Sequence, residues 1–126
     1  MELARTHAGV SVTHLVMAAG IVGVDLAPVP VWPASYEDDH LITVAASTPT
    51  DDTAPFSNHG GSVDLLAPGD LVLSSMPTDG TADDYAFMSG TSQASAVVAG
   101  AAAVVLDAGA GTAPEAARQT LIGSAD

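Results

Sequence analysis

The chain contains no cysteine among its 126 residues. It therefore forms no disulfide, builds no thiolate metal site and offers no cysteine nucleophile. Basic residues are almost as scarce, because two of them stand against fifteen acidic residues and leave a formal net charge of −13 at pH 7. This charge argues against nucleic acids and anionic membranes as partners, since both would repel a strongly acidic protein.

Aromatic residues make up only 4% of the chain, although 48% of it is hydrophobic. The core is therefore expected to consist of alanine, valine and leucine. The longest run of apolar residues and glycine in the main predicted helix, 96–106, has about half of the ~20 residues that span a bilayer. It predicts a buried core helix and no membrane span. The first ten residues lack the basic start and apolar run of a signal peptide.

The apolar pattern predicts one compact α/β unit. A helix end stopped by Gly9 is expected first, followed by a loop of glycine and proline from Gly20 to Trp32. Two β runs come close together before the main helix and predict a hairpin-like pair. A capping box, Thr112 with Glu115, predicts a last helix that ends near Ile122. The expected strands are 10–18, 41–45, 63–69 and 71–75.

The most informative stretch is Phe87–Leu106, where a Ser-Gly-Thr-Ser loop leads directly into the apolar helix. Gly90 is expected to allow a sharp turn and close approach of a ligand. Ser92 stands where the helix is predicted to begin. Its hydroxyl either caps the helix or serves as a nucleophile beside the free N–H groups and positive dipole end of that helix. The same helix end would also suit an anion in a generic ligand-binding domain.

Histidines and acidic residues elsewhere give weaker signals. His14 lies inside a predicted strand, which is typical of a histidine in a core or at a strand end. The acidic corner Glu37–His40 would be able to hold a cation, but adjacent loop residues of this kind are more often simply exposed.

Four segments in the same order resemble the subtilisin-like serine proteases, or subtilases. The stretch 87–100 is similar to the region around their catalytic serine, with Ser-Gly-Thr-Ser, small residues and then Val-Ala-Gly. Together the four segments cover nearly the whole chain, which makes the resemblance specific. The other three are Met-Ala-Ala-Gly at 17–20, Trp-Pro-Ala-Ser-Tyr at 32–36 with 41–45, and Ala-Pro-Phe-Ser-Asn at 54–58 through 63–69.

The resemblance implies a role for several residues. Ser92 would be the nucleophile that forms an acyl-enzyme, and its backbone N–H would be one oxyanion donor. The substrate-binding positions would be Ala18, Ala19 and Gly20, which line a pocket wall, together with Gly90 and Thr91. No cofactor is implied for catalysis. The Trp32–Pro33 bond would be cis, and Ala34, Tyr36 and Asp64 lie in segments that hold a structural calcium ion in some members.

The sequence also departs from the family pattern. Ile21 occupies the position of an asparagine whose side-chain amide is the second oxyanion donor, and isoleucine cannot donate a hydrogen bond. The family's segments with the catalytic aspartate and histidine are absent. His59 falls in a loop where the family has a surface residue, and His7, His14 and His40 have no better claim as base. Ala96 and Val97 replace a Pro-His pair.

These observations predict part of a subtilisin-like three-layer α/β fold, with a mainly parallel sheet and a buried central helix that starts at the nucleophile. Residues 1–126 would be a partial catalytic domain without its amino-terminal half. The missing half would be a partner, and its absence would leave apolar surface exposed.

The expected function is serine endopeptidase action on peptides or proteins, with the isolated chain inactive. The alternative is a degenerate, non-catalytic module that binds a peptide or partner. The family resemblance favours secretion, although no signal peptide is present.

Overall fold

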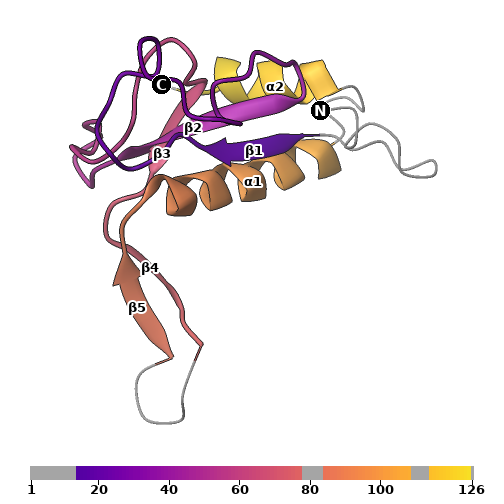
Figure 1. Ribbon diagram of the computed structural model, residues 1–126. Coiled ribbons are helices and arrows are strands. Elements are labelled where there is room, and N and C mark those ends of the chain that lie inside the picture. Colours follow the sequence, from indigo (N-terminus) through magenta and orange to yellow (C-terminus); the bar gives the residue numbers. More distant parts are fainter. Residues whose placement is uncertain (1–13, 78–83, 109–113, 126) are drawn as a thin grey trace.

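The computed structural model describes residues 14–77, 84–108 and 114–125 (Figure 1). The described part of the chain forms a three-stranded sheet, a separate hairpin and two helices. In chain order these elements are β1 (Leu15–Ala18), β2 (Leu41–Ser47), β3 (Leu65–Pro68), β4 (Val72–Ser75), β5 (Tyr85–Met88), α1 (Thr91–Asp107) and α2 (Pro114–Gly123).

The sheet has the order β1-β2-β3, and both strand pairs are parallel. β2 lies in the middle, and all seven of its residues are buried. A continuous apolar run is what a central parallel strand requires, because both of its faces are covered. The predicted strand at 41–45 is therefore confirmed, and it continues to Ser47.

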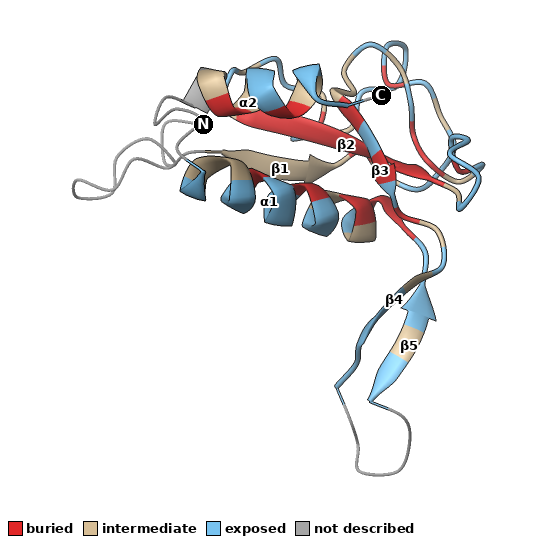
Figure 2. Cartoon of the chain, turned by 180° about the vertical axis from the view of Figure 1, so that it is seen from behind, coloured by how far each residue is buried: buried red, intermediate tan, exposed pale blue. Residues whose placement is uncertain are grey.

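One face of the sheet packs on α1, which runs beneath the strands in Figure 1. From β2 this face presents Ile42, Val44 and Ala46, which belong to the same buried cluster as Ala94 and Val98 of the helix. The buried positions of α1, Thr91, Ala94, Val98 and Ala102, recur every three or four residues and so form one stripe along the helix (Figure 2). Small side chains on this stripe let the helix lie close to the sheet.

The opposite face of the sheet is covered by the long segment between β1 and β2. Leu26 from this segment packs in a second buried cluster with Ala19 and with Ala45 of β2. The Trp32–Pro33 bond is cis, as the resemblance implies. The rings of Trp32 and Tyr36 lie 4.5 Å apart on either side of this turn.

The helix expected to be a buried core helix, α1, is buried on only one side. The stripe facing the sheet is buried, but the other faces are exposed, with Val97 43% and Val104 69% accessible. Nothing in the described part of the chain covers those faces. Apolar surface is therefore exposed on α1, and this agrees with the exposed apolar surface expected from the sequence.

The predicted hairpin of runs 63–69 and 71–75 is wrong in its pairing. β3 joins the parallel sheet, whereas β4 pairs antiparallel with β5, which the sequence interpretation assigned to a loop and motif. The β4–β5 hairpin projects away from the body of the molecule (Figure 1). Its outward side chains are largely exposed, including Leu73, Tyr85 and Phe87. No local pattern indicated this pairing, because a polar segment separates the two strands along the chain.

The second helix, α2, lies beside β2 on the side away from β1 (Figures 1 and 2). Leu121 joins the cluster beneath the sheet, so the predicted last helix is confirmed. Three predictions lie outside the described residues: the Gly9 helix stop, the strand at 10–13 and the Thr112 cap. Within the described ranges no helix is long and apolar enough to cross a membrane.

Candidate active site

Ser92 is the second residue of α1 and is exposed to solvent. The N-cap position belongs to Gly90, and no side chain caps the helix. The interpretation of Ser92 as a capping residue is therefore wrong. Its hydroxyl makes no hydrogen bond with any described residue and is free for another contact.

The backbone at Gly90 differs from the expected sharp turn. Its φ of 163° is extended and accessible to any residue. A Cβ placed there would approach only Oε1 of Gln93, the mobile end of a flexible side chain. Gly90 thus has no conformational need to be glycine, but its small size leaves the approach to Ser92 open.

The first turn of α1 leaves N–H groups without helical partners. The first intrahelical acceptor is the Gly90 carbonyl, which receives the N–H groups of Gln93 and Ala94. Within the described part of the chain the Ser92 N–H has no acceptor, as expected for the start of a helix. An oxyanion beside Ser92 would meet this donor and the positive end of the helix dipole.

Thr91 connects the helix start to the loop that carries Ile21. It is 1% exposed, and its Oγ1 accepts the N–H of Gly20 at 3.1 Å. Ala18 ends β1, and Ala19 is fully buried beside it. The predicted pocket wall (18–20) and the predicted nucleophile are thereby brought together from opposite ends of the chain.

The loop after Gly20 is held by Asn58, a residue that the sequence analysis did not single out. This side chain is fully buried. Its Nδ2 donates to the Ala19 carbonyl at 2.9 Å, and its Oδ1 accepts the N–H groups of Val22 and Val24 at 3.2 Å each. The sequence around it, Ser-Asn-His-Gly-Gly at 57–61, is typical of a loop. No sequence pattern indicated the long-range contacts of its side chain.

Ile21 lies on this fixed loop and is 59% exposed. Its side chain has no hydrogen-bond donor. The second oxyanion contact that the family makes with an asparagine amide therefore cannot form from this side chain, as expected. Gly20 adopts φ 107°, a conformation that favours glycine, and a Cβ there would lie 2.4 Å from Nδ2 of Asn58. The loop therefore has little freedom to rearrange around the substituted position.

A second set of contacts fixes the segment in front of Ser92. The N–H of Gly90 donates to the Gly69 carbonyl at 2.7 Å, and Ser89 Oγ donates to Asp70 Oδ1 at 2.6 Å. The N–H of Leu71 also donates to Ser89 Oγ at 3.0 Å. Leu71 has φ 54°, a strained conformation for a large side chain. These residues were missed because their roles depend on the β4–β5 hairpin.

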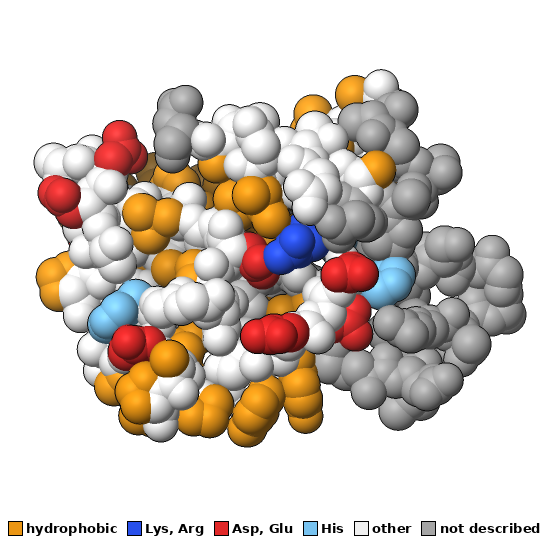
Figure 3. Space-filling view, turned by 90° about the horizontal axis from the view of Figure 1, so that it is seen from above, with side chains coloured by type: hydrophobic (Ala, Val, Ile, Leu, Met, Phe, Trp, Pro, Cys, Tyr) orange, Lys and Arg blue, Asp and Glu red, His pale blue; other side chains and the backbone are white. Residues whose placement is uncertain are grey.

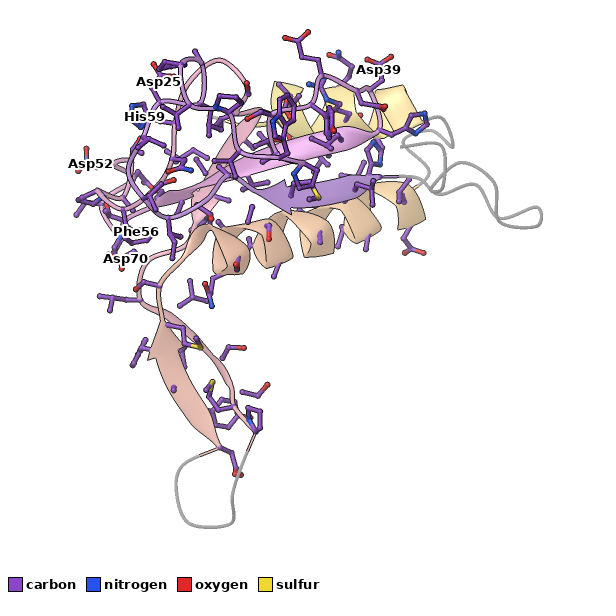
Figure 4. All side chains as sticks on the ribbon, viewed as in Figure 1. Asp25, Asp39, Asp52, Phe56, His59 and Asp70 are labelled. Carbon is purple, nitrogen blue, oxygen red and sulfur yellow. The ribbon has the colours of Figure 1, made fainter. Side chains whose placement is uncertain are left out.

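None of the histidines in the described part of the chain is placed to serve Ser92. His59 lies beside Asp25 in the loops above the sheet, whereas α1 lies below it (Figure 4). It lines a hollow with Ala45, whose side chain points away from α1. His59 is therefore separated from the helix by the sheet.

The other two described histidines lie far from the helix start. His14 borders a groove along the carboxy-terminal half of α1, at Ala99–Leu106. His40 precedes β2, and its N–H donates to Asp38 Oδ1. His7 lies outside the described residues. The three described histidines therefore lie away from Ser92, and the expectation for His7 stays a prediction.

The residues expected near a calcium ion do not fit one well. Asp64 Oδ1 forms an ion pair with Arg118 Nη2, and Asp64 Oδ2 accepts the N–H of Thr43 at 2.8 Å. Arg118 lines a hollow on this face together with four acidic residues, Glu37, Asp38, Asp39 and Asp64. Figure 3 shows acidic side chains in red around a basic side chain in blue. A cation would have to displace or oppose the guanidinium. No cluster of three or more acidic or histidine ligands occurs in the described ranges, including the corner 37–40.

The parallel sheet and its two helices define an α/β protein. Its candidate nucleophile is the exposed serine at the start of α1. The chain belongs to the subtilase family, whose family model matches residues 3–126. It is 45% identical to subtilisin-like protease 7 of Trichophyton equinum over 101 residues. It is also 47% identical over 77 residues to a thermophilic serine proteinase of Bacillus sp. strain AK1, covering 61% of this chain and 18% of that one.

Solved structures agree with this assignment. A cold-adapted subtilisin-like serine proteinase superposes on 87% of the chain with a TM-score of 0.76 and 34% identity. A protease of Pseudoalteromonas arctica PAMC 21717 covers 88% of the chain with a TM-score of 0.79 and 27% identity. Both likenesses confirm the predicted α/β fold with a parallel sheet.

The chain spans only part of these relatives. The match to the Trichophyton equinum protease covers 80% of this chain but 23% of that protein. The two solved structures are covered to 37% and 35% of their chains. Each relative therefore contains further polypeptide beyond the elements described above.

Proposed function

We propose that residues 1–126 form the nucleophile-bearing part of a serine endopeptidase catalytic domain that acts on peptides or proteins. One observation carries this proposal. In a chain of the subtilase family, the exposed Ser92 stands at the start of α1 with a hydroxyl that does not cap the helix. Its backbone N–H supplies one donor to the developing oxyanion. Gly20 and Ala19 lie close by through the contact with Thr91 and border the substrate.

The reaction needs a base that accepts the proton of Ser92 Oγ as the oxygen attacks the peptide carbonyl carbon. The described histidines lie on the wrong face of the sheet or far along α1. The base and the acid that orients it therefore come from another stretch of polypeptide. Without them the hydroxyl keeps its proton and remains a poor nucleophile.

A fluorophosphonate probe tests this proposal, since it reacts with an activated serine. The isolated chain should show no labelling above that of a Ser92→Ala variant. The chain completed with the remaining domain should be labelled at Ser92. Efficient labelling of the isolated chain would show that it contains its own base, and no labelling of the completed domain would contradict the nucleophile assignment.

Ile21 favours a second candidate function, a non-catalytic module that binds a peptide or partner. Loss of one oxyanion donor lowers turnover by about 10²–10³, a magnitude taken from the corresponding donor of a subtilisin. A domain under no need for catalysis would tolerate this loss. The substitution Ile21→Asn in the completed domain separates the two candidates.

A further inference from the structure

Gln93 directly follows the candidate nucleophile as the third residue of α1, and its side chain folds back toward the N-cap residue. A Cβ placed on Gly90 would lie 2.7 Å from Oε1 of Gln93 and 3.8 Å from the backbone nitrogen of Ser92. The carboxamide and the Ser92 N–H therefore border the same small space, which exists because Gly90 has no side chain. Gln93 is half-buried, so a ligand at Ser92 can reach the end of its side chain.

Helix capping is the ordinary role of a glutamine at this position, because its side chain can accept the backbone N–H of the N-cap residue. In this helix that N–H already has a partner, since the Gly90 N–H donates to the Gly69 carbonyl at 2.7 Å. In the described part of the chain no residue exchanges a hydrogen bond with the Gln93 carboxamide. Capping therefore does not account for the position of this side chain.

The carboxamide of Gln93 carries two donors as well as an acceptor. A half-turn about its last torsion exchanges Oε1 and Nε2, and this terminal torsion has broad, roughly two-fold minima. Nε2 can then donate into the space beside Gly90 and Ser92. The loop that Thr91 holds against the helix start carries Ile21, which has no donor. Gln93 thus offers, from the helix, the type of group that the loop lacks.

We propose that Gln93 is a catalytic residue whose Nε2 donates a hydrogen bond to the oxyanion that forms at Ser92. It compensates in part for Ile21. The compensation is partial because the long side chain must be ordered as it donates, so its amide is less preorganised than one on a fixed loop. The proposal rests on the proposed function, because the oxyanion forms only when Ser92 attacks a peptide carbonyl.

Two substitutions in the completed domain test this role. Gln93→Met keeps the length of the side chain but removes the amide. It should lower kcat for a peptide substrate about 10-fold with little change in KM. Gln93→Glu keeps the shape but replaces the donor with a carboxylate oxygen, and it should lower kcat further because it repels the oxyanion. Gln119→Met is the matched control, because Gln119 is exposed on α2, and it should leave kcat unchanged. Unfolding midpoints verify that each variant is folded.

The Ile21→Asn background separates a donor from a packing residue. In that background the oxyanion has a second donor, so Gln93→Met should lower kcat by less than about 3-fold. The gain from Ile21→Asn should correspondingly be larger in the Gln93→Met variant than in the unaltered domain. A residue that only packs beside Gly90 would give the same loss in both backgrounds.

Equal kcat values of the Gln93→Met and unaltered domains would overturn the role of Gln93. A change confined to KM, or an equal loss in both backgrounds, would also overturn it. So would an unaltered domain without turnover that Ile21→Asn activates, although the endopeptidase proposal would then stand. Absence of fluorophosphonate labelling at Ser92 in every variant would contradict the endopeptidase proposal itself, and the role of Gln93 with it.

Discussion

The backbone N–H of Gly20 donates a hydrogen bond to Oγ1 of Thr91 at 3.1 Å, although the two residues are 71 positions apart in the chain. Gly20 precedes the substituted oxyanion position, and Thr91 precedes the candidate nucleophile. Because Thr91 is buried, the contact is shielded from competing water. It fixes the distance between the two parts of the candidate site before any substrate arrives.

Replacing Thr91 with valine should loosen this connection. Valine has nearly the same shape but no acceptor, so the Gly20 N–H loses its partner at a cost of about 1–2 kcal/mol. Urea unfolding measures the loss, and hydrogen exchange at the Gly20 amide should become faster. Thr91→Ser keeps the hydroxyl and should retain slow exchange. Equal protection in both variants would contradict the importance of this contact.

Substitution of two glycines by alanine compares a position where the backbone requires glycine with a position where it does not. Gly20→Ala combines a positive φ with a Cβ only 2.4 Å from Asn58 Nδ2, so it should destabilise the chain by about 2–4 kcal/mol. Gly100→Ala meets nothing within 4 Å in the interior of α1 and should stabilise by about 0.5–1 kcal/mol. The unfolding midpoints of the two variants measure these changes in stability. Equal midpoints would show that the loop after Gly20 rearranges to accommodate the added methyl group.

Much of the fold was predictable because the relevant signals are local. The run Leu41–Ala45 is apolar without interruption, as a central parallel strand must be. The run from Ala94 to Leu106 has small apolar residues at helical spacing. Both strand and helix were located from these patterns within a few residues of their observed ends. The start of α1 followed from the same stretch.

The errors concern contacts between distant parts of the chain. The partner of β4 is β5, and a polar segment separates them, so proximity in sequence favoured the wrong pair. Asn58 has no local feature that distinguishes it from an ordinary turn residue, although it organises the loop at 20–24. The described residues bury only one face of α1, although the helix also carries apolar residues such as Val97 and Val104 on its other faces.

Asn58→Ala should be among the most destabilising substitutions in the described part of the chain. It removes three side-chain hydrogen bonds and leaves the N–H groups of Val22 and Val24 without acceptors. The expected loss is about 3 kcal/mol in the free energy of unfolding. His59→Ala is the control, since this neighbouring side chain is exposed and should change stability by less than about 0.5 kcal/mol. A small effect at Asn58 would mean that the loop is held by other contacts.

Calcium should have little influence on this chain. Both carboxylate oxygens of Asp64 already contact protein donors, one of them the guanidinium of Arg118. The unfolding midpoint should therefore be the same in excess calcium and in excess chelator. Arg118→Met should lower stability by about 1–3 kcal/mol, because it leaves a largely buried carboxylate without its charged partner. A lower midpoint of the unaltered chain in chelator would show that a calcium ion binds despite Arg118.

Ile21→Asn should raise the turnover of the completed domain by about 10²–10³ with little change in KM, since the new amide contacts only the oxyanion of the transition state. The magnitude again comes from the corresponding donor of a subtilisin. Ile21 is exposed, so the substitution should alter stability by less than about 0.5 kcal/mol. Steady-state hydrolysis of a peptide substrate measures the effect, with Ser92→Ala as the inactive control.

The turnover of the completed domain with Ile21 unchanged decides between the two proposed functions. Full turnover with Ile21 in place would rule out the degenerate module and would show that another donor serves the oxyanion. A completed domain that stays inactive after Ile21→Asn, while still binding peptide, would favour the binding module. Both full and intermediate turnover through Ser92 agree with the endopeptidase proposal, and the intermediate result shows in addition that Ile21 limits the reaction.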